Sequence, residues 1–554
     1  MTWILDKLRT NRGRVGCDLA FFVLVAIALI NGIKTTAGVA WPYDLDQFRD
    51  IGMAQAILDH RYGTDHLYLG ETIWYNPLTS AIAAAISSAS GIAPPFVVTQ
   101  AGAYLNLFAP IAFYLLVTCL FNRLIALAAV AAFLFAPIGD APSWAAATYS
   151  PWVFSQNLAQ GFFYLTLVAY GKAIGSKQWR WHLIVGILLG ITFLGHTAPA
   201  VILGIIILVG LMMNSLTQSQ LQVRSALFLK ALPLLLILTI AFIVSLPFTF
   251  SILFHYHLKI LNPVPGNWIY APLAIDKLSD FLRGYLSWVN AIAAVGLVVL
   301  ICTRSARPGK IALFTWLVIC CAALALNEVQ QVTSPRLHLM FVPAHHFLFY
   351  LRAIEGMLFG VGLVWGCRFL ARWLASLSRI GSDHADHFRR RAKAGFVALA
   401  IVVFLLLVYP KYRTRFDFTN ARSQAVSFAE RKAYLDAYRW ILSNTKPVDV
   451  FLSLNGDLDL SIVGPADRKV VVTSQPEFSN PYVDWKSRFN TASQIVDKLT
   501  SAPSDALAAL VANGVNYIIT APIDQFDREP FSFLSKEFSE DDVVIYKVRS
   551  ESKR

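Results

Sequence analysis

The chain has 554 residues, of which 56% are hydrophobic and only 15% carry a charged side chain. This composition excludes an ordinary soluble globular protein and indicates that a lipid bilayer surrounds most of the chain. The net charge of +13 does not indicate a nucleic-acid-binding protein. The Lys and Arg residues lie in short segments between apolar stretches, not on one soluble face.

Eleven apolar segments are long enough, or nearly long enough, to cross a hydrocarbon core of ~30 Å. They lie at 17–33, 97–121, 124–138, 158–174, 181–196, 198–213, 231–253, 285–303, 311–327, 346–367 and 394–410. The first also has the features of a cleavable signal peptide. Two further stretches, 77–94 and 140–157, are candidates for amphipathic helices at the membrane surface. We therefore predict a mainly α-helical, polytopic transmembrane bundle over residues 1–410.

The distribution of basic residues predicts the orientation of this bundle. With a cytoplasmic N-terminus, the segments that face inward contain 20 Lys and Arg in 76 residues, whereas those that face outward contain 8 in 121. The positive-inside rule predicts this asymmetry. Because the number of crossings is odd, the C-terminal part then lies outside the cytoplasm. We expect a multi-pass protein of the inner (plasma) membrane with a periplasmic or extracellular C-terminal domain.

Residues 411–554 show the pattern of a small soluble α/β domain. Helices are expected over 428–443 and 504–513. Strands are expected at 448–454, 469–473, 517–520 and 543–548. The domain offers neither a nucleophile arrangement nor a phosphate-binding loop, so we assign it no chemistry.

The long first outward segment, residues 34–76, is called the first loop below, and an acidic pair lies near its start. Asp44 and Asp46 follow the first membrane helix. Near the low-dielectric bilayer, two carboxylates are suited to accept a proton from a hydroxyl group or to hold a divalent cation such as Mg²⁺ or Mn²⁺. The alternative is that they cap a helix beginning near Asp46. We favour a catalytic or metal-binding role, because the loop is otherwise apolar and aromatic.

The first loop continues with residues suited to binding a sugar ring or a polar head group. The candidates are Glu71, Trp74 and Tyr75. A belt of aromatic side chains at the membrane interface explains them equally well. His196, at the turn between two apolar helices, is expected to face the same cavity, although a structural histidine at a helix end is the commoner case.

Two later outward segments carry cationic and histidine side chains near the outer leaflet. The candidates are Lys259 in the earlier segment and Arg336, His338, His345, His346 and Arg352 in the later one. Such a cluster can neutralise and hydrogen-bond a lipid-linked phosphate as the anion leaves water. The alternatives are ordinary contact with anionic lipid and pairing of Arg352 with Glu355 along the same helix.

The arrangement resembles the GT-C superfamily of integral-membrane glycosyltransferases, which take sugars from polyprenyl-phosphate or polyprenyl-pyrophosphate carriers. Three features carry the resemblance. They are the acidic pair after the first helix, the run Tyr75-Asn76-Pro77-Leu78 that opens the next apolar segment, and the extracytoplasmic α/β domain. The layout covers nearly the whole chain, so it implies the fold of that superfamily.

The resemblance also implies an activity. One of Asp44 and Asp46 matches the catalytic base that deprotonates the acceptor hydroxyl, and the other orients that hydroxyl or binds metal. Cations such as Arg336 and Arg352 then stabilise the departing lipid phosphate. The implied partners are a polyprenyl-phosphate-linked sugar, a lipid or glycan acceptor and membrane lipids, with no nucleic acid.

Two other functions stay open at this point. A transporter or flippase of lipid-linked sugars also needs a cation-lined groove, but it usually places polar groups near the bilayer midplane, within broken helices and internal repeats. A polysaccharide polymerase or ligase is better matched by a large outward loop late in the chain. Here the candidate groups lie at the outward ends and the long loop comes early, which favours a transferase.

Overall fold

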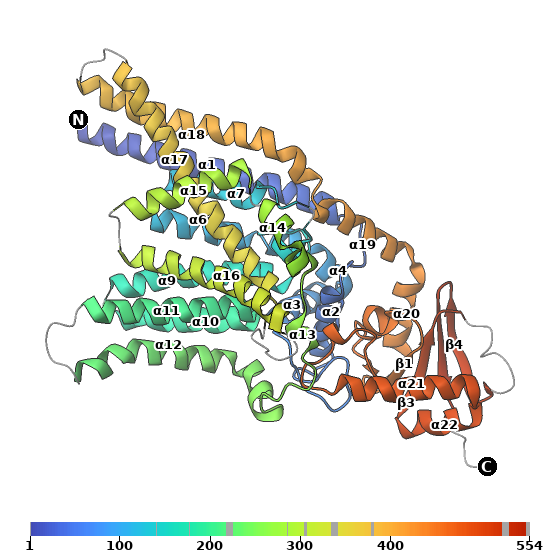
Figure 1. Cartoon of the computed structure of the whole chain (residues 1–554). Helices are drawn as coiled ribbons and strands as arrows, with labels where there is room; N and C mark the ends of the chain where they lie inside the picture. The colour runs from blue at the N-terminus through green and yellow to red at the C-terminus, as the bar shows by residue number, and fades with distance from the viewer. Residues whose placement is uncertain are drawn as a thin grey trace.

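Long helices run side by side through one half of the molecule, and a small α/β unit lies at the other end (Figure 1). The computed structural model describes residues 2–139, 141–176, 178–217, 225–284, 286–303, 307–333, 342–377, 382–522 and 531–549. Every predicted apolar segment coincides with a helix over most of its length. The main helices are α1 (Thr2–Thr36), α6 (Phe108–Leu120), α7 (Arg123–Phe135), α9 (Ser155–Gly175), α10 (Trp179–Gly195), α11 (Thr197–Thr217), α12 (Ser225–Phe250), α15 (Trp288–Cys302), α16 (Arg307–Thr333), α17 (Leu348–Leu377) and α18 (Ser382–Arg413).

In the described part of the chain, six helices are by themselves long and apolar enough to cross a membrane. They are Val15–Thr36, Gly102–Leu120, Ala231–His255, Gly309–Thr333, Ala344–Ser376 and Ala392–Arg413. Others, such as α7 and α10, are apolar but shorter. The polytopic helical bundle is thus confirmed, while the total of eleven crossings and their orientation stay predictions. Helices suit this environment because their backbone polar groups are satisfied within the element.

Small residues bring some of these helices into backbone contact. A Cβ atom at Gly296 of α15 would collide with the carbonyl oxygen of Leu358 in α17, and one at Gly362 would collide with that of Ile292. Close approach through small residues is typical of helix packing in membranes, where burial from water does not drive association. The α15–α17 pair therefore depends on glycine at both positions.

Short helices and turns gather at the end of the bundle nearest the C-terminal domain. They are α2 (Leu45–Leu58), α3 (Leu78–Ser90), α4 (Pro94–Gln100), α5 (Gly102–Leu105), α8 (Ser143–Ala146), η1 (Ser251–His255), α13 (Val264–Asn267), η2 (Ala271–Leu273), η3 (Ile275–Lys277), α14 (Leu278–Gly284) and η4 (Ala344–Phe347). The apolar segment predicted at 97–121 is divided among α4, α5 and α6, and its part Gly102–Leu120 is long and apolar enough to cross a membrane. Asn106 donates to the carbonyl oxygens of Ser150 and Trp152 at 2.9 and 2.7 Å, which holds the break against a neighbouring segment.

The C-terminal domain is a five-stranded sheet between helices. Its elements are η5 (Phe416–Phe418), α19 (Asn420–Glu430), α20 (Lys432–Asn444), β1 (Val450–Ser453), η6 (Asp459–Val463), β2 (Lys469–Val470), η7 (Pro476–Phe478), α21 (Trp485–Ser501), α22 (Pro503–Ala512), β3 (Val515–Thr520), β4 (Leu534–Glu540) and β5 (Val543–Val548). The strand order is β2-β1-β3-β5-β4, with β1 parallel to β2 and β3, and β5 antiparallel to β3 and β4. Apolar residues of α21 and α22 cover one face of the sheet, and α20 covers the other.

Most of this domain follows the predicted order, with three differences. The helix predicted over 428–443 is two helices, because the chain turns at Arg431, whose guanidinium lies over the rings of Phe428 and Tyr434 at 5.8 and 5.5 Å. The elements α21 and β4 were not predicted. The signal for α21 was present in the sequence, because Trp485, Phe489, Ala492, Ile495 and Leu499 recur at helical spacing, whereas β4 is rich in polar residues.

The first loop and the C-terminal domain share one hydrophobic core. Trp41, Phe48 and Leu67 of the loop region belong to the same buried cluster as Tyr438 and Phe451 of the domain. The ring centroids of Trp41 and Tyr438 lie 5.4 Å apart in an edge-to-face arrangement. The first loop therefore lies between the helix bundle and the C-terminal sheet, and both sides fix its position.

Candidate functional site

The acidic pair lies at the start of α2. Asp44 is the N-cap residue, and its carboxylate accepts a hydrogen bond from the backbone N–H of Asp46 at 2.9 Å. The capping alternative considered from the sequence is therefore correct for one oxygen of Asp44. The residue is half-buried. Burial and the negative charge of Asp46 raise the pKa of Asp44 to about 7, which places its titration near neutral pH.

Arg49, one turn further along α2, connects the acidic pair to an aromatic ring. Its guanidinium contacts the carboxylates of Asp46 at 2.6 Å and Asp50 at 3.4 Å. The same group lies 3.3 Å from the centroid of the Tyr75 ring. Because the side chains of Arg49 and Asp50 are only 8% and 2% exposed, each neutralises a charge that water cannot reach. This network fixes Asp46 and Tyr75 relative to each other.

Asp50 extends the network to the membrane helices. Its second carboxylate oxygen accepts a hydrogen bond from Ser155, at the first turn of α9, at 3.4 Å. Burial raises the pKa of Asp50 to about 6. Arg49 and Asp50 were not predicted as site residues. The available signal was their i, i+3 and i, i+4 spacing from Asp46, which places all three on neighbouring positions of one helix.

Three histidines meet at the same end of the bundle. The ring centroids of His196 and His346 are 4.4 Å apart, and those of His345 and His346 are 4.1 Å apart. Nδ1 of His196 accepts a hydrogen bond from the backbone N–H of Ala198 at 3.3 Å. In the neutral ring this leaves the proton on Nε2, which is then available as a donor. The structure thus brings together three of the histidines that the sequence singled out.

Asn76 joins the first loop to these histidines. Its side-chain amide donates to the carbonyl oxygen of Phe193 at 2.5 Å and accepts from the Thr197 hydroxyl at 3.3 Å. These contacts lie on both sides of His196, at the turn between α10 and α11. The contacts of Asn76 therefore fix the position of Tyr75, which comes just before it, and of α3, which begins at Leu78.

Replacing Asn76 with Ala is expected to destabilise the protein by ~1–3 kcal/mol, because the carbonyl of Phe193 loses its side-chain donor in a buried place. Asn76 is only 5% exposed. Thermal unfolding in detergent measures the change. Asn444→Ala is the matched control, because the exposed Asn444 amide bonds the Trp440 carbonyl within one helix. An equal shift in both variants would contradict this role for Asn76.

An aromatic cluster surrounds His345. The Trp144 ring lies 5.5 Å and the Trp268 ring 5.1 Å from that of His345, and Tyr270 lies 5.4 Å from Trp144. These residues come from α8 and from the segment after α13. They were not predicted, because aromatic side chains are common wherever a chain leaves a membrane. The cluster packs against His345 and presents three half-buried rings.

The other predicted phosphate-binding residues lie elsewhere or outside the described residues. Arg352 pairs with Glu355 at 2.9 Å, the alternative noted from the sequence. Lys259 is exposed. Arg336 and His338 fall within residues 334–341, which the structure does not describe. Among the predicted phosphate-binding residues that the structure describes, His345 and His346 therefore lie closest to each other.

The predicted substrate-binding residues of the first loop divide into two groups. Trp74 packs edge-to-face against Tyr75 with centroids 5.7 Å apart, beside Arg49. Glu71 instead forms an ion pair with Arg488 of α21 at 3.7 Å, and its carboxylate lies 3.9 Å from the His255 ring nitrogen. Trp74 and Tyr75 are thus connected to the acidic pair, while Glu71 links the loop to the C-terminal domain.

The described residues do not form a complete metal site. Among them, no three His, Cys, Asp or Glu side chains gather in a way that could hold an ion. Asp44 and Asp46 together offer fewer oxygen ligands than a magnesium ion requires, and Asp46 is already paired with Arg49. A metal bound by this pair needs further ligands from water or substrate, and we derive no step through it.

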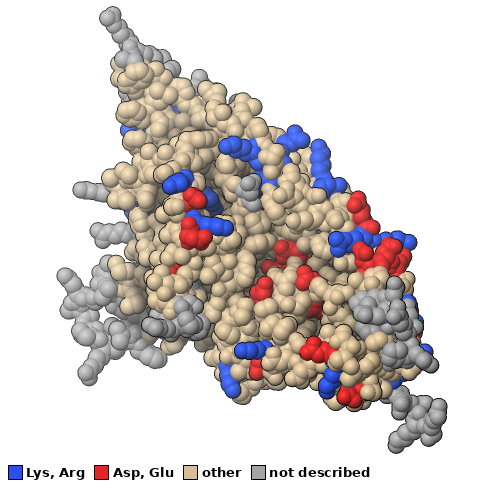
Figure 2. All heavy atoms as spheres, turned by 45° about the vertical axis from the view of Figure 1, so that its right-hand side comes forward, with Lys and Arg blue, Asp and Glu red and all other residues tan. Residues whose placement is uncertain are grey.

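Acidic side chains gather in a hollow at the middle of the face drawn in Figure 2, between the bundle and the C-terminal domain. Acidic groups in a hollow are costly unless they are neutralised or hydrogen-bonded.

No protein-family model and no curated protein matches the sequence. Solved structures do match. ArnT from Cupriavidus metallidurans, in a crystal structure with undecaprenyl phosphate bound, aligns with a TM-score of 0.54 at 14% identity over 95% of this chain and 97% of its own. The apo oligosaccharyltransferase of Archaeoglobus fulgidus aligns with a TM-score of 0.52 at 14% identity, over 90% and 69%.

The mycobacterial arabinofuranosyltransferase AftD aligns with a TM-score of 0.52 at 12% identity, over 96% of this chain and 40% of its own. At these identities the matches establish the fold. They extend through the bundle and the C-terminal domain alike, in agreement with the resemblance found in the sequence. The chain has the fold of the GT-C superfamily of membrane glycosyltransferases.

Proposed function

We propose that the protein is a membrane glycosyltransferase that moves a sugar from a polyprenyl-phosphate-linked donor to a lipid or polysaccharide acceptor at the outer face of the membrane. The observation that carries this proposal is the convergence of Asp44 and Asp46, the Arg49–Tyr75 pair and the histidines at one end of the bundle. Undecaprenyl phosphate bound to ArnT, which has the same fold, supports this class of donor.

Asp44 is the proposed catalytic base. Its carboxylate takes the proton of an acceptor hydroxyl while that oxygen forms a bond to the anomeric carbon of the donor sugar. The bond from the anomeric carbon to the phosphate oxygen breaks, and the electron pair leaves with the polyprenyl phosphate. Direct displacement of this kind inverts the anomeric centre. A pKa of about 7 suits the task, because the group is sufficiently ionised and sufficiently basic at neutral pH.

Asp46 has a different part in this proposal. Because Arg49 holds one of its oxygens at 2.6 Å, Asp46 is less available to accept a proton and better suited to orient the acceptor. The charge of Asp46 keeps the Asp44 carboxyl basic. Trp74 and Tyr75, beside Arg49, form the proposed wall for the sugar.

The histidines are the proposed donors to the departing phosphate. Nε2 of His196 carries a proton when the ring is neutral, and His346 lies against the same ring. Hydrogen bonds aimed at a leaving oxygen stabilise the negative charge as it develops. The same anion has further candidate partners in Arg336, His338 and Lys259. A divalent cation is another candidate, and measuring transfer with and without EDTA tests its contribution.

Transfer of radiolabelled sugar by the purified protein, from a panel of polyprenyl-phosphate sugars, tests this function. We expect turnover with at least one donor. Loss of turnover in Asp44→Asn with donor binding retained would identify the base, whereas the same pattern in Asp46→Asn alone would assign that role to Asp46. Movement of intact lipid-linked sugar across vesicles, with no transfer from any donor, would contradict the proposal and support a flippase.

The pH dependence of transfer is expected to depend on Asp46. Since the base must be deprotonated, kcat/KM falls as the pH drops below the pKa of Asp44, about 7. The negative charge of Asp46 raises that pKa, so Asp46→Asn lowers it and moves the acid limb to lower pH. Profiles of residual activity measure this shift. An acid limb at the same pH in both proteins would contradict the assignment of Asp44.

A further inference from the structure

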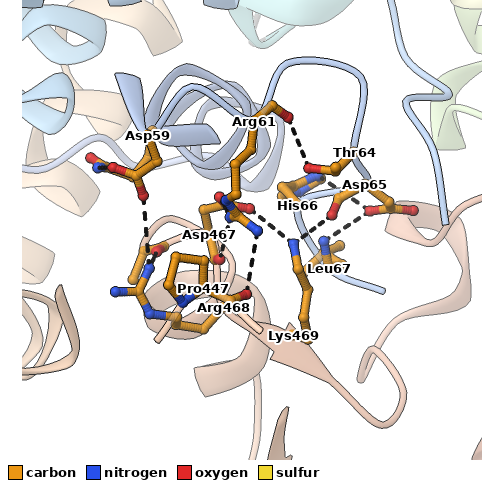
Figure 3. Close-up of polar contacts among 12 residues, drawn as sticks. Asp59, Arg61, Thr64, Asp65, His66, Leu67, Pro447, Asp467, Arg468 and Lys469 are labelled. Carbon is orange, nitrogen blue, oxygen red and sulfur yellow. Dashed lines mark hydrogen bonds and ion pairs between the residues drawn. The ribbon is translucent and has the colours of Figure 1, made fainter. Parts of the chain in front are cut away.

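A buried ionic network ties the first loop to the C-terminal domain (Figure 3). The Lys469 ammonium group donates to the backbone carbonyl of Asp65 at 2.6 Å and pairs with the Asp467 carboxylate at 3.1 Å. Arg61 of the loop forms an ion pair with the same carboxylate. Asp65, Asp467 and Lys469 are at most 2% exposed. Charges at such depth are stable only with their partners in place, so the network requires both parts of the chain.

Backbone and amide contacts strengthen this junction. The backbone N–H of Val470 donates to the carbonyl of Leu67 at 2.7 Å, which extends the edge of the sheet at β2 into the first loop. The Asn480 side chain donates to the Asp65 carboxylate at 2.8 Å. The domain thus holds the loop segment around Asp65 from two sides.

The junction reaches α2 through a close contact. A Cβ atom at Gly52 would collide with the carbonyl oxygen of Gly464 and would lie 2.8 Å from the His66 ring. Helix α2 is therefore held between a residue of the loop and the backbone of the domain. Burial keeps the pKa of His66 well below its usual value, and the charges of Lys469 and of Arg49, one turn before Gly52, lower it further.

We propose that the C-terminal domain is a positioning part of the active site, in which Lys469 and the Gly52–Gly464 contact set the placement of α2. This inference rests on the proposed function. Lys469 touches no proposed reacting group, so it is a positioning residue. The domain contributes no catalytic group of its own, but it fixes the helix that carries Asp46, Arg49 and Asp50.

Two variants test the positioning role. Lys469→Met keeps the length of the side chain and removes its charge, and Gly52→Ala forces α2 away from Gly464. We expect each to lower kcat by ~10-fold or more, since small displacements of reacting groups carry large costs. The Kd for polyprenyl phosphate should change by less than about twofold, because the histidines are untouched. Amides of α2 should exchange hydrogen faster than in the wild-type protein.

Matched controls separate positioning from general damage. In Gly171→Ala, in α9, the added Cβ atom has no neighbour within 4 Å. Lys432→Gln removes an exposed lysine of the C-terminal domain. Both are expected to leave kcat and α2 exchange unchanged. Adding Lys469→Met to Asp44→Asn should have less effect than adding it to the wild type, because both changes act on the same step.

The inference would be overturned if both variants lost donor binding and kcat to the same extent. It would also be overturned if kcat, counted per molecule that binds the donor, stayed at the wild-type value. If the wild-type protein transfers no sugar, the proposed function fails, and α2 exchange then decides the positioning role alone. Unchanged exchange in both variants would overturn it in that case too, whereas faster exchange limited to α2 would support it.

Discussion

Replacing Asp44 with Asn is expected to lower kcat for sugar transfer by ~10²- to 10⁴-fold, the contribution typical of a positioned general base. An Asn side chain still accepts the hydrogen bond from the Asp46 backbone N–H that caps α2. The helix therefore keeps its start, and the loss reports on proton transfer. Steady-state transfer assays measure kcat, and equilibrium binding of polyprenyl phosphate measures whether the donor site persists.

Asp505→Asn is a suitable control for this substitution. Asp505 lies in the first turn of α22, in the C-terminal domain, and is exposed. It should leave transfer unchanged. A kcat for Asp44→Asn within about threefold of the wild-type value would remove Asp44 from the role of base, because no positioned base contributes so little.

Replacing Arg49 with Met is expected to destabilise the protein by ~3–5 kcal/mol, the cost typical of leaving a buried carboxylate without its partner. Asp46 and Asp50 both lose their partner, and Asp50 accounts for the larger loss of stability because its side chain is only 2% exposed. Tyr75 also loses the cation that lies 3.3 Å from its ring centroid. Transfer should fall with stability, because Asp46 and Tyr75 no longer share a partner. Thermal unfolding and transfer assays measure the two effects.

The double variant Arg49→Met/Asp50→Asn separates charge from packing. It should regain part of the lost stability, since the buried carboxylate is gone, but not the transfer activity. Arg439→Gln is the control for loss of an ion pair in itself, because Arg439 is 59% exposed and pairs with Asp436 on one helix. Its effect should stay within ~0.5 kcal/mol. Equal destabilisation by Arg439→Gln and Arg49→Met would contradict the buried network.

Much of the fold could be predicted from the sequence because the relevant signals are local. Apolar segments such as 158–174 and 394–410 are helices, since a bilayer leaves the backbone few other solutions. Short runs of β-branched and aromatic residues marked the strands at 517–520 and 543–548. The break within 97–121 could not be predicted, because Asn106 is held by carbonyl groups more than forty residues away.

The candidate site was only partly predictable for the same reason. Short motifs in the first loop pointed to Asp44, Asp46 and Tyr75, and the structure links Asp46 to Tyr75 through Arg49. Arg49 looked like one of many loop cations in the sequence. Its significance depends on burial and on three partners at once, of which Tyr75 comes from the far end of the first loop.

The role of the C-terminal domain was also hidden from the sequence. Lys469 occurs in an ordinary strand pattern, where a lysine is normally exposed. In the fold it is 2% exposed and bonds Asp65, some four hundred residues earlier in the chain. Residue 411 therefore marks a change in the sequence pattern, but the first loop and the C-terminal domain share one hydrophobic core.

The most direct measurement of the central claim is the fate of a doubly labelled donor, with one label in the sugar and another in the polyprenyl phosphate, incubated with purified protein and acceptor in vesicles. We expect the sugar label to enter the acceptor and free polyprenyl phosphate to appear in equal amount, with both products absent in Asp44→Asn. Recovery of intact donor on the opposite leaflet, with its two labels still joined, would contradict the account and identify a flippase.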